Sequence, residues 1–239
     1  MSRFILTLRQ REVIADRTMA CHFAKPPGFQ FAAGQTLDLT LIAPPETDAE
    51  GDARTFTIAS APQDGDLMIA TRLRDTAFKR VLSSVPVGTE AQAEGPDGSL
   101  TLHADARIPA VFLTGGIGIT PFRSMIRDAV ARKLAHQLWL FYSNNRPEDA
   151  AFLDELQHIA DLTPSFHFIP TMTSMEKSHR PWRGETKLID GDMVSRRLPM
   201  SGPRYYVAGP PAMVKAMREM LTSARVDSKD ICTEEFAGY

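Results

Sequence analysis

The feature that most constrains this fold is a short apolar run that ends in a glycine-rich turn and continues as an amphipathic segment. Residues 110–113 are Ala-Val-Phe-Leu and residues 114–121 are Thr-Gly-Gly-Ile-Gly-Ile-Thr-Pro, after which apolar side chains recur at helical spacing. This pattern predicts a buried strand, a tight turn and a helix, with Thr120 as the N-cap and Pro121 in the first helical turn. Because free N–H groups at a helix start attract phosphate, the stretch predicts a dinucleotide site. The same pattern also connects strand to helix in other α/β domains.

The composition excludes several kinds of site and partner. The 239 residues carry a formal net charge of -2, so neither nucleic acid nor an anionic membrane is an expected partner. The two cysteines, Cys21 and Cys232, are far apart, and the six histidines lack metal-binding spacings, so no metal or iron–sulfur site is expected. No leader-like or membrane-spanning apolar run is found. The expectation is a cytoplasmic protein in a reducing compartment.

The first part of the chain has the pattern of an antiparallel sheet. Short segments of alternating hydrophobicity are separated by turns rich in proline and glycine, and lie at residues 37–41, 56–58, 67–70 and 100–102. Closely spaced strands of this kind predict a barrel or sandwich. One helix is expected within it, over residues 76–83.

Beyond residue 105 the pattern alternates between strands and helices. The expected strands lie at residues 110–113, 138–142, 166–169 and 205–208, and the intervening helices begin near residues 120, 147 and 210. This alternation predicts a parallel, doubly wound sheet. In such sheets ligands bind at the carboxyl ends of the strands, which places a site where the two halves of the chain meet.

Four motifs, in order along the chain, resemble those of the ferredoxin–NADP reductase superfamily of FAD-dependent oxidoreductases. Residues 54–57, Arg-Thr-Phe-Thr, resemble its Arg-x-Tyr-Ser/Thr flavin motif, and residues 115–121 resemble its Gly-Gly-x-Gly-x-Thr-Pro nucleotide motif. Residues 208–211, Ala-Gly-Pro-Pro, are similar to its Cys-Gly-Pro-x segment, and residues 234–236, Glu-Glu-Phe, to its aromatic ending. The resemblance implies a Greek-key FAD-binding barrel over residues 1–104 and a Rossmann-like NAD(P)-binding domain over residues 105–239.

For the flavin, the resemblance implies roles for the first motif and for the start of a helix that meets the pyrophosphate. Arg54 would bind an FAD phosphate, Phe56 would stack on the isoalloxazine ring, and Thr57 would hydrogen-bond near its N5. On its own, the first motif also fits an ordinary strand with an exposed arginine. Asp75 stands where the family often has glycine, and its carboxylate would repel a pyrophosphate. The implied flavin-binding residues are Arg54, Thr55, Phe56, Thr57, Thr76, Ala77, Phe78 and Lys79.

For NAD(P)H, the resemblance implies contacts from the glycine turn, from the loop after the second parallel strand and from a nicotinamide pocket. These residues are Thr114, Gly115, Gly116, Gly118, Thr120 and Pro121, then Ser143, Asn144 and Arg146, then Gly209, Pro210 and Pro211. Ala208 replaces the family's cysteine. No acidic residue directly follows the second strand, and Arg146 would meet a 2′-phosphate, which favours NADPH slightly. The alternative is that Arg146 is a solvated loop charge.

The last residues of the chain carry the family's aromatic ending. In the proteins it resembles, a C-terminal aromatic side chain covers the flavin face that nicotinamide must reach. Phe236 matches that position and joins Thr57 as an expected catalytic residue, while Tyr239 would pack against adenine or fray. The alternative is that Phe236 closes the core of the second half.

The implied reaction is hydride transfer from NAD(P)H to FAD, followed by delivery of electrons to a separate acceptor such as a ferredoxin, a flavodoxin, an oxygenase component or a small molecule. With no iron–sulfur or haem domain in the sequence, a stand-alone monomer is expected. Two alternatives stay open: a reductase of free flavin, quinone or ferric chelates, and a non-catalytic flavin-binding partner subunit. A basic cluster either docks an acidic electron-transfer partner, holds FAD phosphate or is solvated, and consists of Arg72, Arg74, Lys79 and Arg80.

Overall fold

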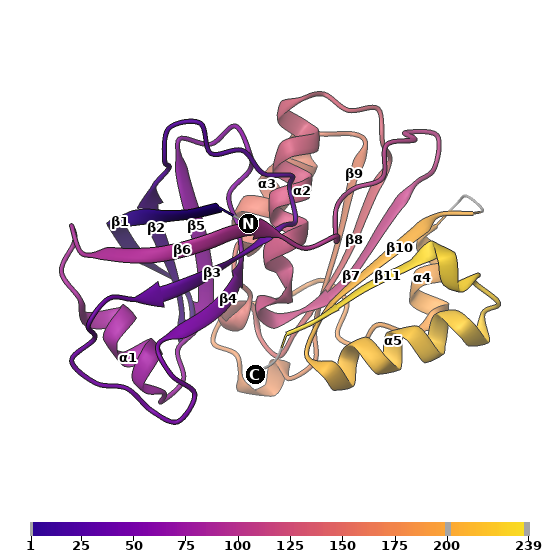
Figure 1. The fold of residues 1–239 in the computed structure, drawn as a ribbon. Coiled ribbons are helices and arrows are strands. Elements are labelled where there is room, and N and C mark those ends of the chain that lie inside the picture. The colour runs from indigo at the N-terminus through magenta and orange to yellow at the C-terminus, as the bar shows by residue number, and fades with distance from the viewer. Residues whose placement is uncertain (1, 199–201, 237–239) are drawn as a thin grey trace.

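Two sheets lie side by side in the computed structural model, which describes residues 2–198 and 202–236 (Figure 1). The first sheet is antiparallel with strand order β4-β3-β6-β1-β2-β5, and the second has the order β11-β10-β7-β8-β9. All strand pairs of the second sheet are parallel. The expected fold class, an antiparallel barrel followed by a Rossmann-like sheet, is confirmed.

The antiparallel sheet encloses an apolar core. Its strands are β1 (Ser2–Ala15), β2 (Thr18–Ala24), β3 (Thr36–Leu41), β4 (Ala53–Thr57), β5 (Asp66–Arg72) and β6 (Glu90–Asp97). Along β3, Leu37, Leu39 and Leu41 are buried and Asp38 is exposed, as expected for a strand with one face on a core. Helix α1 (Ala77–Ser84) adds Phe78, Val81 and Leu82 to the same core.

One expected strand of the antiparallel sheet is absent, and three of its strands were not expected. The segment 100–102 forms no strand, and Leu100 instead packs into an apolar cluster that contains residues of both halves. The sixth strand is β6, which runs through the Gly-Pro-Asp sequence that suggested a turn. Strands β1 and β2 were missed because polar and apolar residues alternate irregularly along β1, whose pairing with β2 shifts register twice.

The parallel sheet is covered by helices on both faces. Its strands are β7 (Ala110–Gly115), β8 (Leu138–Asn144), β9 (Phe166–Met172), β10 (Arg204–Gly209) and β11 (Ile231–Glu235). Helices α2 (Thr120–Ala131) and α3 (Leu153–Leu162) pack on one face. Helices α4 (Gly191–Arg197) and α5 (Pro211–Ser223) pack on the other. Burial on both faces explains why β7 and β10 are continuous apolar runs.

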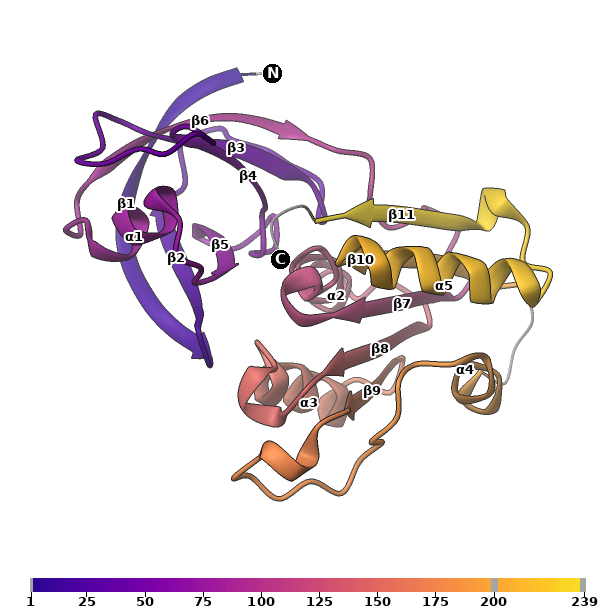
Figure 2. The same ribbon diagram turned by 90° about the horizontal axis from the view of Figure 1, so that it is seen from below.

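The strand order places a crevice between β7 and β10. From β7 the chain adds β8 and β9 on one side, then returns to add β10 and β11 on the other. Strands that diverge in this way leave a ligand crevice at their carboxyl ends. Those ends are Gly115 and Gly209, which belong to the two glycine motifs, and β7, β8 and β11 point toward the antiparallel sheet (Figure 2).

Within the described residues, no helix has both the length and the apolar character needed to cross a membrane. Cys21 is buried in the first core and Cys232 is partly buried on β11, and both thiols are free.

Candidate cofactor-binding site between the two sheets

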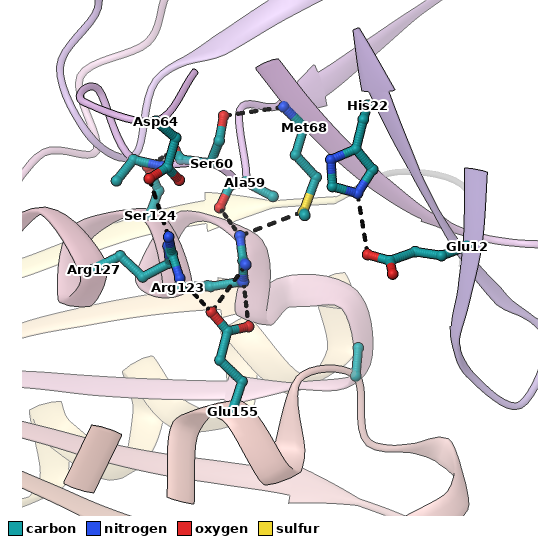
Figure 3. Close-up of polar contacts among 12 residues, drawn as sticks. Glu12, His22, Ala59, Ser60, Asp64, Met68, Arg123, Ser124, Arg127 and Glu155 are labelled. Carbon is teal, nitrogen blue, oxygen red and sulfur yellow. Dashed lines mark hydrogen bonds and ion pairs between the residues drawn. The ribbon is translucent and has the colours of Figure 1, made fainter. Parts of the chain in front are cut away.

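A polar network joins the loop after β4 to helix α2, which follows the glycine turn (Figure 3). Arg123 donates from Nη1 to the carbonyl oxygen of Ala59 at 2.6 Å. Ser124 donates its hydroxyl to the carbonyl oxygen of Ser60, also at 2.6 Å. Arg123 further pairs with both carboxylate oxygens of Glu155 at 2.8 and 2.9 Å. Because these groups are buried or partly buried, they hold the two halves in one arrangement.

The expected flavin motif lies on β4, beside helix α1. The Arg54 guanidinium carbon is 5.2 Å from the ring centroid of Phe78. The Phe56 and Phe78 ring centroids are 5.8 Å apart. Thr57 is only 6% exposed, and its hydroxyl has no hydrogen-bond partner. A buried hydroxyl without a partner is costly, so Thr57 fits a site that a polar ligand atom completes.

The start of α1 is also placed beside Arg54. Thr76 is the N-cap, and its hydroxyl oxygen accepts the Lys79 N–H at 3.4 Å. The Ala77 N–H donates to Oδ2 of Asp48 at 2.8 Å. Arg54 therefore lies near the helix start, as expected. The hydrogen bond of the Ala77 N–H, however, is already accepted by the carboxylate of Asp48 in the β3–β4 loop, a residue that the sequence did not implicate.

Two expectations about this region need correction. Asp75 is 91% exposed and its carboxylate pairs with Arg80, so it does not face the start of α1. The Thr55 hydroxyl donates to the Asp38 carboxylate on the neighbouring strand, so this side chain links β4 to β3 and is not directed at a cofactor. Alternation along β4 accounts for this, because Thr55 lies on the face opposite Arg54 and Phe56.

The glycine turn packs directly against β10. A Cβ atom on Gly118 would lie 2.6 Å from the Ala208 oxygen and 2.7 Å from the Gly209 Cα. Gly116 has a φ of 55°, which glycine adopts without strain. Gly118 is therefore required for close contact between the turn and the sheet.

The expectation that Thr120 is the N-cap of α2 was wrong. A 3₁₀ turn at Gly116–Ile119 continues straight into α2, so Thr120 is the first helical residue. Its hydroxyl donates to the Ile117 carbonyl at 3.1 Å. The Thr114 hydroxyl likewise donates to the Ala208 carbonyl at 2.8 Å, and Pro121 is buried in the second position of α2. Thr114, Thr120 and Pro121 therefore stabilise the turn through contacts inside the protein.

A cavity of about 1180 Å³ opens at the carboxyl ends of β7 and β8 and extends to the antiparallel half. Asn144 is 5% exposed, and neither its amide nitrogen nor its amide oxygen has a hydrogen-bond partner. Such a side chain fits a cavity that a polar ligand fills. Among the residues that line the cavity are Gly115, Gly116, Ser143, Asn144, Arg146, Pro210 and Met213. Gly209, with a φ of 150°, and Pro211 lie beside it at the start of α5.

Arg146 lines this cavity, but its guanidinium is already paired. It donates to both carboxylate oxygens of Asp149 at 2.9 and 2.8 Å. A third contact, to the Asp16 carboxylate at 2.9 Å, connects it to the antiparallel half. Because Asp149 and Asp16 already pair with it, Arg146 would have to exchange them for a 2′-phosphate, so this residue gives the expectation of NADPH no support.

Phe236 lies where β11 meets the crevice. Its N–H donates to the Gly209 carbonyl oxygen at 3.0 Å. Its side chain is half-buried and belongs to none of the three apolar clusters among the described residues. This placement gives no support to the alternative that Phe236 closes the core. Tyr239 lies outside the described residues.

Glu234 is a candidate that sequence reasoning missed. Its Oε2 is buried and has no hydrogen-bond partner, and burial raises the pKa of its carboxyl from 4.5 to about 7. The residue pairs with Ala208 across the parallel strands, two positions before Phe236. The Glu-Glu-Phe motif contained it, but only the three-dimensional structure distinguishes its burial from the exposure of Glu235.

Comparisons with known proteins agree with this arrangement. The oxidoreductase NAD-binding domain family matches residues 112–219. Ferredoxin–NADP reductase B of Sorangium cellulosum is 28% identical over 211 residues, which are 85% of this chain and 84% of that protein. A ferredoxin NADP⁺ reductase from Neisseria gonorrhoeae, solved with bound FAD and NADP, has a TM-score of 0.80 and 20% identity, over 98% of each chain. This structural likeness shows the shared fold.

The reductase component of propane 2-monooxygenase from Rhodococcus jostii is 28% identical over 216 residues. The match covers 89% of this chain but 57% of that protein, so the chain spans little more than half the length of this relative.

Proposed function

Because the chain belongs to the ferredoxin–NADP reductase superfamily, we propose that it is an FAD-dependent oxidoreductase that takes a hydride from NAD(P)H and delivers electrons to a separate acceptor. The observation that carries this proposal is the buried junction of Arg123 and Ser124 with the carbonyl oxygens of Ala59 and Ser60. It fixes the end of the flavin-motif strand against the helix that follows the glycine turn. Proximity of two cofactor sites is what direct transfer between them requires.

The residues of the antiparallel half would hold FAD. Bound FAD would supply the chemistry of accepting a hydride and releasing electrons singly. Arg54 and the Ala77 N–H are donors for its phosphates, the Phe56 ring supplies an apolar face, and the unpartnered Thr57 hydroxyl supplies a hydrogen bond. Lys79 adds positive charge at the same helix start.

The residues around the crevice would bind the nicotinamide nucleotide. The turn at Gly115 and Gly116 offers backbone for the pyrophosphate, and the unpaired amide of Asn144 offers both a donor and an acceptor. Phe236, at the crevice edge, would cover the flavin until nicotinamide displaces it. Glu234 would exchange a proton near neutral pH, because burial raises the pKa of its carboxyl to about 7.

Within this function we propose NADH as the preferred donor. Asp149 and Asp16 neutralise Arg146 and place carboxylates where a 2′-phosphate would lie. The parent protein should therefore have a higher kcat/KM with NADH than with NADPH. Asp149→Asn should raise the value for NADPH more than the value for NADH, because it frees the guanidinium. A parent that prefers NADPH would restore the original expectation.

The acceptor, the assembly and the location are also proposals. The printed names of the relatives, a ferredoxin–NADP reductase and a monooxygenase reductase component, support a separate ferredoxin-like or oxygenase partner. We propose a cytoplasmic monomer in which the two halves, residues 1–104 and 105–239, are separate domains. Sedimentation would test the assembly, and limited proteolysis near residue 105 would test the boundary.

The experiment that tests the proposed function is anaerobic reduction of the FAD-loaded protein by NADH and by NADPH, followed through the flavin absorbance band. Arg54→Ala should weaken FAD retention by roughly tenfold to a hundredfold. Arg9→Ala is the matched control, because Arg9 forms an exposed ion pair with Asp66 on the antiparallel sheet. If Arg54→Ala holds FAD as tightly as the parent, the flavin assignment is wrong.

A further inference from the structure

A short acidic stretch lies across the start of helix α1. We call residues 46–51, between β3 and β4, the acidic segment. Asp48 Oδ2 accepts the Ala77 N–H at 2.8 Å, and Asp48 Oδ1 lies 3.5 Å from Nη2 of Arg54. Glu50 Oε2 accepts from the same nitrogen of Arg54 at 2.8 Å. Asp48 thus holds the helix N–H group, while the Arg54 guanidinium is hydrogen-bonded to Glu50 and lies at ion-pair distance from Asp48.

These are the donors assigned above to the FAD phosphates. A carboxylate and a phosphate accept hydrogen bonds from the same groups, since both present anionic oxygens to N–H donors. One backbone N–H makes only one strong bond, so Asp48 and a phosphate oxygen cannot both occupy the Ala77 position. Like charges at this distance also repel each other.

We propose that Asp48 is an internal competitor for the pyrophosphate of FAD, which occupies the phosphate-binding donors in the cofactor-free protein and must leave them when FAD binds. This inference rests on the proposed function, because it takes the flavin site as given. It makes Asp48 a residue that sets FAD affinity without contacting the cofactor.

The surrounding charges favour the exchange. Burial, and after it the nearby Arg74 and Arg54, lower the pKa of the Lys79 ammonium. Among the described residues, neither Lys79 nor Arg74 forms a side-chain hydrogen bond or ion pair. Positive charge is therefore incompletely balanced while Asp48 is in place. A pyrophosphate carries more negative charge than one carboxylate and therefore balances this positive charge better.

The acidic segment is held by a second contact that the phosphate would not disturb. Glu46 accepts from Arg80 at 3.0 and 2.7 Å. Arg80 is three residues beyond Ala77, on the exposed side of α1, and its other carboxylate partner is Asp75. Glu46 and Arg80 would keep the segment beside the helix while Asp48 withdraws, so the exchange requires only a local movement.

The test measures dissociation constants of flavin-free protein for FAD and for riboflavin, which lacks the pyrophosphate, by quenching of flavin fluorescence. Asp48→Asn should tighten FAD binding by about tenfold and leave riboflavin binding unchanged, because only FAD competes for the donors. Asp48→Ala, which removes the acceptor entirely, should tighten FAD binding as well. Asp75→Asn is the matched control: it removes an equal charge from the same region and should change neither constant.

Weaker FAD binding in both Asp48 variants, or an equal change for riboflavin, would overturn the inference and leave the proposed function intact. Equal tightening by Asp75→Asn would overturn it too, because it would show a general charge effect. A parent protein that binds neither flavin would overturn the proposed function itself. Thermal unfolding of the flavin-free variants gives an independent readout: Asp48→Ala should lower the melting temperature, since α1 loses the acceptor at its first turn.

Discussion

Arg123 and Ala59 are 64 residues apart in the chain, yet the guanidinium of the first donates to the carbonyl oxygen of the second at 2.6 Å. Arg123 is 5% exposed, and its guanidinium carbon lies 4.3 Å from the ring centroid of Phe152. Arg123 is buried and contacts Glu155, a carbonyl group and an aromatic face. These contacts fix the position of α2 relative to the loop after β4. The relative placement of the two sheets therefore depends on this side chain.

Removal of Arg123 should be costly for that reason. Arg123→Ala leaves Glu155 and the Ala59 carbonyl without their main donor, and should lower the free energy of unfolding by about 3–5 kcal/mol. Urea denaturation measures the effect. Arg180→Ala is the control, because Arg180 forms an exposed ion pair with Asp154 of α3 and should cost at most about 0.5 kcal/mol. Equal losses in the two variants would show that the junction adds no stability.

Gly118 should tolerate no side chain. Gly118→Ala would force a Cβ against the backbone of β10, at 2.6 Å from the Ala208 oxygen, and should cost about 1–3 kcal/mol. It should also weaken binding of the nicotinamide nucleotide, because the turn moves away from the crevice. Gly65→Ala is the control, since its added Cβ would meet nothing within 4 Å. Parent-like stability and nucleotide affinity in Gly118→Ala would contradict the packing argument.

Glu234 predicts a pH dependence of stability. Burial raises the pKa of its carboxyl from 4.5 to about 7, so the folded state binds the proton more tightly than the unfolded chain. The free energy of unfolding therefore falls as pH rises through this interval and levels off above it.

Glu234→Gln removes that titration. The variant should match the parent near about pH 4 and exceed its stability near about pH 8 by about 1–3 kcal/mol. Glu235→Gln, at the exposed neighbour, should retain the parent's pH dependence. Chemical denaturation at the two pH values measures the free energy of unfolding. The same pH dependence of this free energy in the parent and in Glu234→Gln would rule out a buried charge at Glu234.

Phe236→Ala should change nucleotide binding more than stability. The ring lies outside the apolar clusters, so its loss should cost about 1 kcal/mol, against about 3–5 kcal/mol for Phe112→Ala in the core. Oxidised nicotinamide nucleotide should bind more tightly, because no ring opposes its stacking. Nucleotide titration and thermal unfolding test both parts. Unchanged affinity together with a melting temperature as low as that of Phe112→Ala would identify Phe236 as a core residue.

The sequence was informative where chemistry is carried by short, contiguous motifs. The strands at the glycine turn and at Gly209, the helix start at Thr76 and the fold class followed from local pattern. The pairing of Arg146 with Asp16 and the capping of Ala77 by Asp48 did not follow, because they join residues far apart in sequence. The burial of Glu234 was equally hidden, since adjacent glutamates look identical until the strand assigns one of them to each face.

The two sheets differ in when they can form during synthesis. The antiparallel sheet uses only residues 2–97, so all its strands can pair while the ribosome is still adding the second half. The crevice, in contrast, needs β7 beside β10, which joins residues 110–115 to residues 204–209, and so waits for nearly the whole chain. N-terminal units commonly fold first in this way. A nascent chain would thus form the proposed flavin site before the nucleotide crevice exists, and FAD would then bind before the nicotinamide nucleotide.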